Sequence, residues 1–253
     1  MQALHDHIAK DGFRLRGVNM SRIDGFSDVV FGFALTLIVV SIEVPHTYEE
    51  LHAVLAGFVP FAICFVLFLT VWWSHYQFFR RFGLEDSTTV VLNCALLFTV
   101  LFYVYPLKFL FTLVGSQLTG HASAHVFSSD PLTAGLQGRE LFMVYGAGYA
   151  GIYFLFAALN WNAWHQRIHL RLSPLELLLT KTYIWKNVGL AITGIVCVVV
   201  ARLLRPEDSG LSGFCFFLIP IWETLYGSLA VRRIRAAQAR ALPEDRTAIS
   251  HHS

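Results

Sequence analysis

Long apolar runs, separated by short polar segments, dominate the pattern along the chain. A helix that crosses a bilayer needs about 20 mostly apolar residues. Six runs reach that length, at residues 23–44, 53–76, 88–114, 140–160, 177–201 and 211–231. None shows the alternation of apolar and polar residues that a membrane barrel strand requires. The pattern therefore predicts an all-α fold, a bundle of six transmembrane helices.

The polar segments indicate how the chain is organised. Residues 1–21 form a polar N-terminal segment without the apolar core of a cleaved signal peptide. Residues 236–253 form a polar C-terminal tail, and residues 115–139 form the one long loop that the pattern predicts. Because no internal repeat is visible, we expect residues 22–235 to form a single transmembrane domain.

Basic residues predict the orientation of this domain. With the N-terminus placed inside, most of the 19 Lys and Arg residues fall in inner segments. Arg80 and Arg81 follow the second run, for example, whereas the loop after the first run, EVPHTYEE, has neither Lys nor Arg. Loops rich in Lys and Arg stay in the cytoplasm. We therefore expect a multi-pass protein of the cell membrane with both termini cytoplasmic.

Composition narrows the class of protein. Of the 253 residues, 55% are hydrophobic and 14% charged, against about 25% charged in soluble domains. A formal net charge of +2 and the absence of a basic cluster argue against a nucleic-acid partner. No motif for a cofactor or a structural metal is present. The expected surroundings are the lipid bilayer, with no cofactor.

The first run begins with ionisable groups, which are costly inside a bilayer. Arg22 and Asp28 are six residues apart, so they lie on nearly opposite faces of a helix and do not pair within it. Asp28 is followed directly by the apolar sequence VVFGFAL. We therefore expect Asp28 to meet a group on another helix.

A single helical stripe follows the polar start. Val29, Phe33, Thr36 and Val40 recur at a spacing of three or four residues. Such a stripe can face lipid or a protein core. Around the axis of a symmetric oligomer it would instead form an apolar throat with a ring of hydroxyls. The spacing alone does not choose between these arrangements.

The residues at this start carry a family resemblance. Residues 22–28, Arg-Ile-Asp-Gly-Phe-Ser-Asp, fit the motif RxxxFSD, and the sequence VVFGFALTLIVVSIEVP that follows completes a helix-like run. Together they resemble the first helix of the lysosomal potassium channel family of the transmembrane protein 175 type. The likeness continues at Trp72 and His75 in VWWSHYQFFRRF and at Asn93 in VVLNCALLF. Six spans without a repeat resemble the short bacterial form of the family.

The resemblance implies a homotetrameric, leak-type channel that conducts potassium through a pore lined by the first helix, without a TVGYG filter. Its constriction would involve Phe33, Thr36 and Val40, with Val29 on the same stripe and potassium passing transiently near Thr36. Members of the family usually carry Ile or Leu where this chain has Phe33, so a ring of four phenyl groups would replace an aliphatic ring.

The family motif would then anchor the first helix to its neighbours. Buried indole, imidazole and amide groups all require hydrogen-bond partners. The expected packing network comprises the motif residues and the polar residues of spans two and three, namely Arg22, Phe26, Ser27, Asp28, Trp72, His75 and Asn93.

Two other functions remain open. A proton-conducting channel or secondary transporter needs ionisable groups along its path, for which Asp28, His75 and Glu223 are the candidates. An intramembrane serine protease would use the GxSG sequence at residues 210–213, but the only later histidines, His251 and His252, lie in the polar tail. We therefore do not expect an enzyme.

Overall fold

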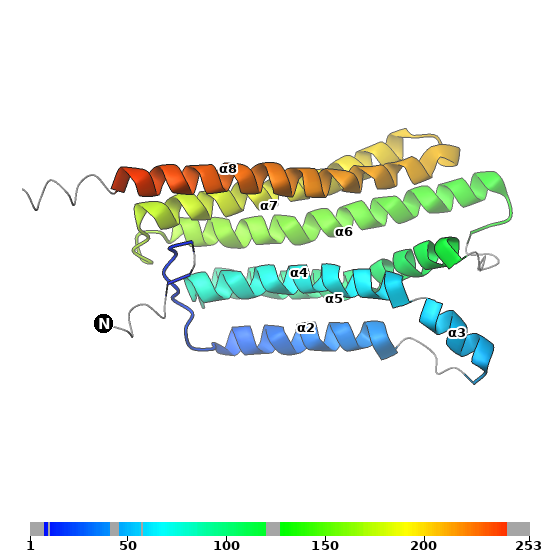
Figure 1. Cartoon of the computed structure of the whole chain (residues 1–253), viewed down its shortest axis with the longest axis horizontal. Helices are drawn as coiled ribbons and strands as arrows, with labels where there is room; N and C mark the ends of the chain where they lie inside the picture. The colour runs from blue at the N-terminus through cyan, green and yellow to red at the C-terminus, as the bar shows by residue number, and fades with distance from the viewer. Residues whose placement is uncertain (1–7, 10, 41–45, 57, 120–126, 242–253) are drawn as a thin grey trace, which may run out of the picture.

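The computed structural model describes residues 8–9, 11–40, 46–56, 58–119 and 127–241, and the elements in them are helices (Figure 1). The prediction of an all-α fold is confirmed. In chain order the elements are α2 (Arg22–Val40), α3 (Tyr48–Ala56), α4 (Phe58–Phe82), α5 (Ser87–Thr119), α6 (Pro131–His165), α7 (Pro174–Leu203), the 3₁₀ helix η1 (Pro206–Phe217) and α8 (Leu218–Ala241).

The long helices lie roughly parallel, with α2 along one edge of the bundle (Figure 1). α2 packs against α4 and α5, and α5 in turn packs against α6. On the other side, α6 and α7 form the most extensive helix contact, and α8 lies against α7. The N-terminal segment crosses one end of the bundle before it enters α2 (Figure 1). α2 is therefore an outer helix that is supported from one side.

Within the described residues, four helices are long and apolar enough to cross a membrane: Phe61–Phe82, Ser87–Leu110, Pro131–His165 and Pro174–Leu203. α2 and α8 are not among them. In both helices, the stretch whose side chains the structure describes is shorter than a membrane span. The prediction of six spans thus rests on the apolar runs of the sequence for these two helices.

The structure corrects the predicted loop at residues 115–139. α5 continues to Thr119 and α6 begins at Pro131, so helix occupies both ends of that range. The start of α6 has a local cause: the Asp130 carboxylate accepts a hydrogen bond from the Thr133 amide, and Pro131 follows at the first helical position. Within α5, Pro106 does not end the helix.

The last predicted span, residues 211–231, is also shifted. Residues 206–217 form η1, and the α-helix runs from Leu218 to Ala241. The predicted tail at 236–253 therefore begins as helix, and its residues beyond 241 lie outside the described part. Ser212 is buried within η1 and donates a hydrogen bond to the Ser209 carbonyl. This hydrogen bond lies within the 3₁₀ helix, and no described histidine or carboxylate forms a hydrogen bond with the Ser212 hydroxyl.

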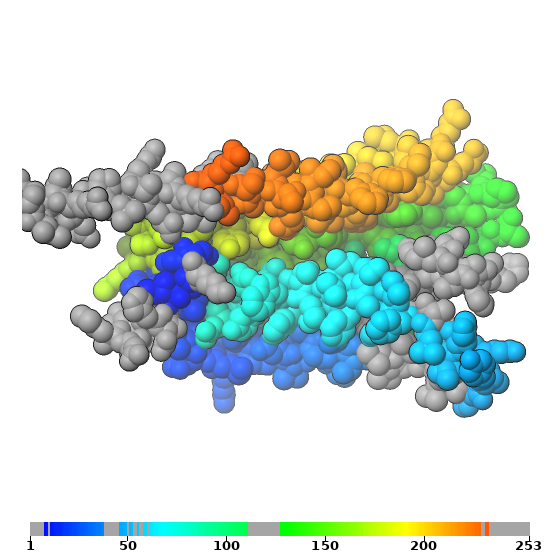
Figure 2. All heavy atoms as spheres, in the orientation of Figure 1, coloured from blue at the N-terminus to red at the C-terminus, as the bar shows by residue number. Residues whose placement is uncertain are grey.

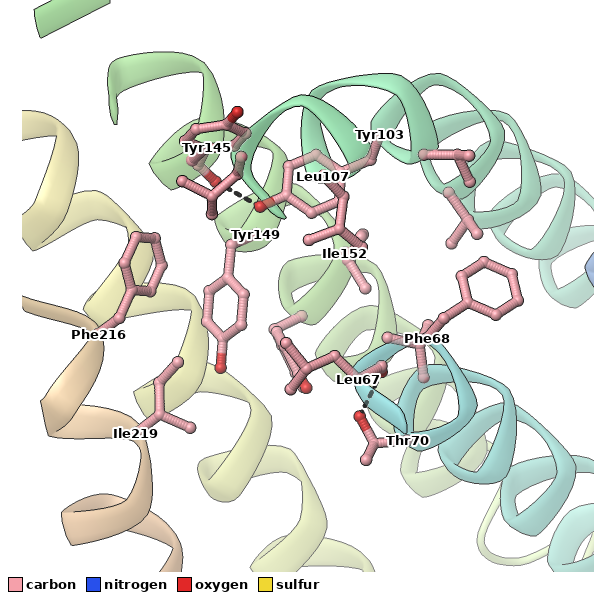
Figure 3. Close-up of a pocket in the computed structure, with 15 residues that line it drawn as sticks. Leu67, Phe68, Thr70, Tyr103, Leu107, Tyr145, Tyr149, Ile152, Phe216 and Ile219 are labelled. Carbon is pink, nitrogen blue, oxygen red and sulfur yellow. Dashed lines mark hydrogen bonds between the residues drawn. The ribbon is translucent and has the colours of Figure 1, made fainter. Parts of the chain in front are cut away.

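An apolar cavity of about 250 Å³ lies between α4, α5, α6 and the start of α8 (Figure 3). Two tyrosines close it on the α5 side. The Tyr103 hydroxyl donates to the Tyr145 carbonyl at 3.1 Å, and the Tyr145 hydroxyl donates to the Pro106 carbonyl at 2.7 Å. The carbonyl of the helix-interior Pro106 thus accepts one bond from α6, and the two bonds together join α5 to α6.

Candidate functional site

α2 has two faces with different surroundings. Ser27, Phe31 and Ala34 are almost completely buried against the bundle. Their spacing of three or four residues places them on one side of the helix. The residues between them, Val29 and Phe33, point the other way and are 70% and 60% exposed. The helix therefore presents an uncovered apolar stripe away from its own bundle.

Two of the predicted constriction residues, Phe33 and Thr36, lie on this exposed stripe. Phe26 precedes Val29 and Phe33 on it, and Thr36 follows. The Thr36 hydroxyl donates a hydrogen bond to the Phe33 carbonyl at 2.7 Å. Because the proton is used within the helix, the lone pairs of this oxygen remain free as acceptors. Val40 ends α2, but its side chain lies outside the described part.

A chain of buried hydrogen bonds holds the opposite face of α2. The Asn93 amide nitrogen donates to Ser27 Oγ at 2.9 Å, and Ser27 in turn donates to the Ile23 carbonyl at 2.7 Å. The amide oxygen of Asn93 lies 2.8 Å from His75 Nε2. Since this oxygen only accepts, the His75 proton is placed on Nε2. Ser27, His75 and Asn93 are each fully buried, so the chain joins α2, α5 and α4 without water.

Aromatic rings enclose this polar chain. The His75 ring lies 4.7 Å from the Phe79 ring and 5.2 Å from the Phe31 ring, centroid to centroid. His75 Nδ1 has no hydrogen-bond partner in the described residues. Protonating that nitrogen would bury a charge among apolar rings, which is costly. The arrangement therefore keeps the imidazole neutral and serves to position α2.

A second hydrogen bond pins α2 to α4. The Trp72 indole nitrogen donates to Asp28 Oδ1 at 2.8 Å, and the indole stacks on Tyr76 with centroids 5.7 Å apart. The structure thus places Asp28 against another helix.

Two other motif residues lie apart from the network. The Arg22 and Phe26 side chains are exposed, and within the described residues the Arg22 side chain forms no hydrogen bond or ion pair.

The N-terminal segment supplies contacts that the sequence did not suggest. Arg16 pairs with Glu176 at 2.8 Å, and Asp11 pairs with Arg81 at 2.8 Å. The first contact ties the segment to the start of α7 and the second to the end of α4. A local signal exists only for part of this cluster: Ser173 and Glu176 form a capping box, which the spacing SxxE indicates. Nothing local marks Arg16 as the partner of a residue 160 positions away.

The candidate groups for a proton-conducting channel or transporter, Asp28, His75 and Glu223, lie in different contacts. Glu223 on α8 forms an ion pair with Lys186 on α7 at 2.9 Å. Asp28 and His75 belong to the contact between α2, α4 and α5. In the described part of the chain no hydrogen bond or ion pair links Glu223 to either of them. The three candidate groups thus lie in two separate clusters.

Comparison with known proteins identifies the class. The sequence model of the family described as "Endosomal/lysosomal potassium channel TMEM175" matches residues 22–103, which contain α2, α4 and the first half of α5. A curated relative named "Potassium channel", from Marivirga tractuosa, is 36% identical over 241 residues, covering 92% of this chain and 94% of its own. A second curated potassium channel, from Streptomyces collinus, is 26% identical over 113 residues, covering 42% of this chain and 55% of its own.

Solved structures agree with the sequence relatives. A crystal structure of a variant of the potassium channel MtTMEM175, in complex with a nanobody fusion protein, superposes with a TM-score of 0.76 at 30% identity. The superposition covers 89% of this chain and 99% of the MtTMEM175 chain. The TMEM175 homologue from Chamaesiphon minutus shares the fold, with a TM-score of 0.53 at 23% identity. The chain belongs to the TMEM175 family, as its motif predicted, and is a multi-pass membrane protein.

Proposed function

We propose that this chain is a leak-type, potassium-selective cation channel, a homotetramer in which four copies of α2 line a central pore. One observation carries the proposal: α2 leaves an apolar stripe with a single hydroxyl uncovered while polar bonds fix its other face. The Marivirga tractuosa relative and MtTMEM175, which are both named as potassium channels, support it.

The polar bonds explain why the stripe faces a fixed direction. In a bilayer, an apolar face is equally stable against lipid and against other apolar side chains, so hydropathy does not set the rotation of a helix. Ser27 and Asp28 do set it, because each has its partner on α5 or α4. With the rotation fixed, a closed ring of copies brings identical stripes together around one axis.

Such a ring accounts for selective conduction. At the level of Phe33 an apolar constriction excludes water, so an ion must shed part of its hydration shell to pass. Potassium holds that shell less tightly than sodium. One turn further, the Thr36 oxygens would accept the ion, because their protons are already donated to the Phe33 carbonyls. No TVGYG sequence is needed for this mechanism.

The placement of basic residues supports cytoplasmic termini and location in the cell membrane. Arg16 donates to the Leu170 carbonyl at 3.1 Å, next to Arg171, and Arg81 pairs with Asp11 of the same N-terminal segment. These contacts gather the basic residues of separate segments at one end of the bundle. Positive charge concentrates on the cytoplasmic side of membrane proteins. We extend the proposal to six spans, with α2 and α8 crossing beside the four apolar helices.

Reconstitution in planar bilayers tests the proposal. Under opposed potassium and sodium gradients, the reversal potential should approach the potassium equilibrium potential, and the detergent-solubilised protein should have the mass of four chains. Equal permeability to chloride, or a monomeric mass, would overturn it.

Phe33→Ala tests the constriction itself. Removing four rings from one level widens the throat, so single-channel current should rise or the preference for potassium over sodium should fall. Phe98→Ala is the matched control, because Phe98 is also an exposed aromatic residue but lies on α5. If both variants conduct like the original protein, Phe33 does not form the constriction.

A further inference from the structure

A second cavity, of about 270 Å³, lies between α4, α6 and α7. Unlike the cavity of Figure 3, it has a polar lining, to which Gln77, Arg81, Asn160, Lys186 and Asn187 contribute. In Figure 2, α4 and α8 lie in front, and green to yellow atoms of α6 and α7 are visible between them. Arg81 is near the end of α4 that contacts the N-terminal segment, so the cavity lies toward the end of the bundle that the basic residues mark as cytoplasmic.

The charges around this cavity favour an anion. Arg81 and Lys186 both line it, and no Asp or Glu belongs to the lining. Their carboxylate partners lie outside the lining: Asp11 pairs with Arg81 at 2.8 Å and Glu223 with Lys186 at 2.9 Å. Each pairing occupies one edge of its cation. The lining itself therefore offers hydrogen-bond donors from two cationic side chains and no carboxylate, since the carboxylate partner of each cation lies outside it.

Unused polar groups indicate that the cavity is built for a ligand. Asn187 is only 8% exposed and forms no hydrogen bond with a described residue, although its side chain lines the cavity. Arg81 Nη1 likewise has no partner in that part of the chain. Asn160 uses its amide nitrogen on the Phe156 carbonyl. A buried guanidinium nitrogen without a partner costs free energy, and a ligand with several acceptor oxygens removes that cost.

The rest of the lining is apolar and aromatic. Phe78, Phe82 and Phe156 are buried side chains of the lining, while Trp73 on α4 is half exposed. Tryptophan is enriched where a membrane protein meets the lipid headgroups. The cavity thus combines cationic and amide donors with an apolar wall.

We propose that this cavity binds a phosphate group, carried either by an anionic phospholipid or by free inorganic phosphate. The phosphate oxygens would accept hydrogen bonds from Lys186, Arg81 and the Asn187 amide, and charge-assisted bonds of this kind are the stronger ones. The proposal does not depend on conduction by α2, because no residue of that helix lines the cavity.

Native mass spectrometry of the purified full-length protein tests the proposal with phosphatidylglycerol, phosphatidylcholine and inorganic phosphate as probes. Phosphatidylglycerol should bind, phosphatidylcholine should bind more weakly, and Asn187→Ala should weaken the phosphatidylglycerol complex about ten-fold. Lys186→Met combined with Glu223→Gln should do the same without leaving a lone carboxylate. Lys181→Met is the matched control, since Lys181 is an exposed lysine of α7 that lies over Trp164 and does not line the cavity.

The competition arm separates the two sources of phosphate. Displacement of phosphatidylglycerol by millimolar inorganic phosphate would assign the site to the free ion, and resistance to displacement would assign it to the lipid. Equal binding of both lipids, or equal loss in Lys181→Met and Asn187→Ala, would overturn the proposal. Unfolding temperatures measured without lipid or phosphate show whether each variant is folded. A folded Asn187→Ala variant that binds phosphatidylglycerol as the original protein does would also overturn the proposal.

Discussion

The contact between α6 and α7 and the contact between α2 and its neighbours are made in different ways. α6 and α7 approach so closely that a Cβ atom on Gly146 would lie 2.7 Å from the Gly194 carbonyl oxygen, and one on Gly194 would lie 2.6 Å from that of Gly146. Neither glycine of α2 lies at such an approach: a Cβ atom on the exposed Gly32 would meet nothing within 4 Å, and one on Gly25 would meet only the Met20 side chain. Polar bonds from Ser27 and Asp28 hold α2 instead.

The difference corresponds to what each pair of helices must do. Small residues let two backbones approach in a membrane, where the hydrophobic effect does not drive association. Such packing fixes α6 and α7 but leaves little surface uncovered between them. The bonds on α2 fix its rotation with few atoms and leave its other face free. A helix that must present one face to other copies of the chain gains from the second arrangement.

The largest effect should follow from breaking the close packing. In Gly194→Leu the new side chain would collide with the backbone of α6, which cannot move aside, so we expect loss of the folded protein. Fluorescence-detected size-exclusion chromatography measures this as loss of the folded peak. Gly151→Ala on α6 is the control, because its Cβ would meet only Thr99 Cγ2 at 3.7 Å. A folded Gly194→Leu would show that the helices can separate.

A smaller but clear effect should follow from Asn93→Leu. The substitution removes both hydrogen bonds of a fully buried amide and leaves His75 Nε2–H and Ser27 Oγ without their partner. We expect a loss of about 1–3 kcal/mol in the free energy of unfolding, measured by denaturation in mild detergent. Cys94→Ala changes the neighbouring exposed residue and should be neutral. Equal stability of the two variants would mean that the buried bonds do not hold α2.

Trp72→Phe should have a smaller effect, because it removes one hydrogen bond and keeps an aromatic ring in place. The loss of the bond to Asp28 should cost about 1 kcal/mol and lower the unfolding temperature slightly. Trp73→Phe, at the exposed neighbouring position, is the control. A lower potassium selectivity in Trp72→Phe alone would further show that the rotation of α2 affects the stripe.

The smallest effect concerns Asp86, at the junction between the two regions. Burial raises the pKa of this carboxyl, but hydrogen bonds from Thr89, Gln166 and Asn162 outweigh burial and lower the pKa from 3.8 to about 2. A pKa depressed by folding stabilises the protein above the unfolded value, and this contribution is lost as the pH falls through the folded value. Unfolding temperatures should thus decrease between about pH 4 and pH 2.

Asp86→Asn should remove that part of the pH dependence, because an amide does not titrate, while its oxygen can still accept a hydrogen bond from Thr89. Glu85→Gln, at the exposed position next to Asp86, is the control. A pH dependence that persists unchanged in Asp86→Asn would assign it to other carboxyl groups.

Local signals allowed some features to be predicted from the sequence. The length of the apolar runs gave the helices, and the spacing of Val29, Phe33 and Thr36 placed them on one stripe. The start of α6 follows from Asp130 and Pro131, although the apolar run began later because the first turns of α6 are mixed in polarity. Caps and periodicity depend on residues within one or two turns, which the chain itself supplies.

The tertiary structure decided which face of α2 is free. Ser27 meets a residue 66 positions away and Asp28 one 44 positions away, and no local pattern encodes such pairs. The polar cavity is likewise assembled from three helices. The physical reason is the lipid surroundings. Hydropathy determines that a segment becomes a membrane helix, but it does not determine how the helix is rotated about its axis. The apolar faces of the helix are equally stable toward lipid and toward protein. Rotation is set by the few polar groups whose partners only the folded chain brings within reach.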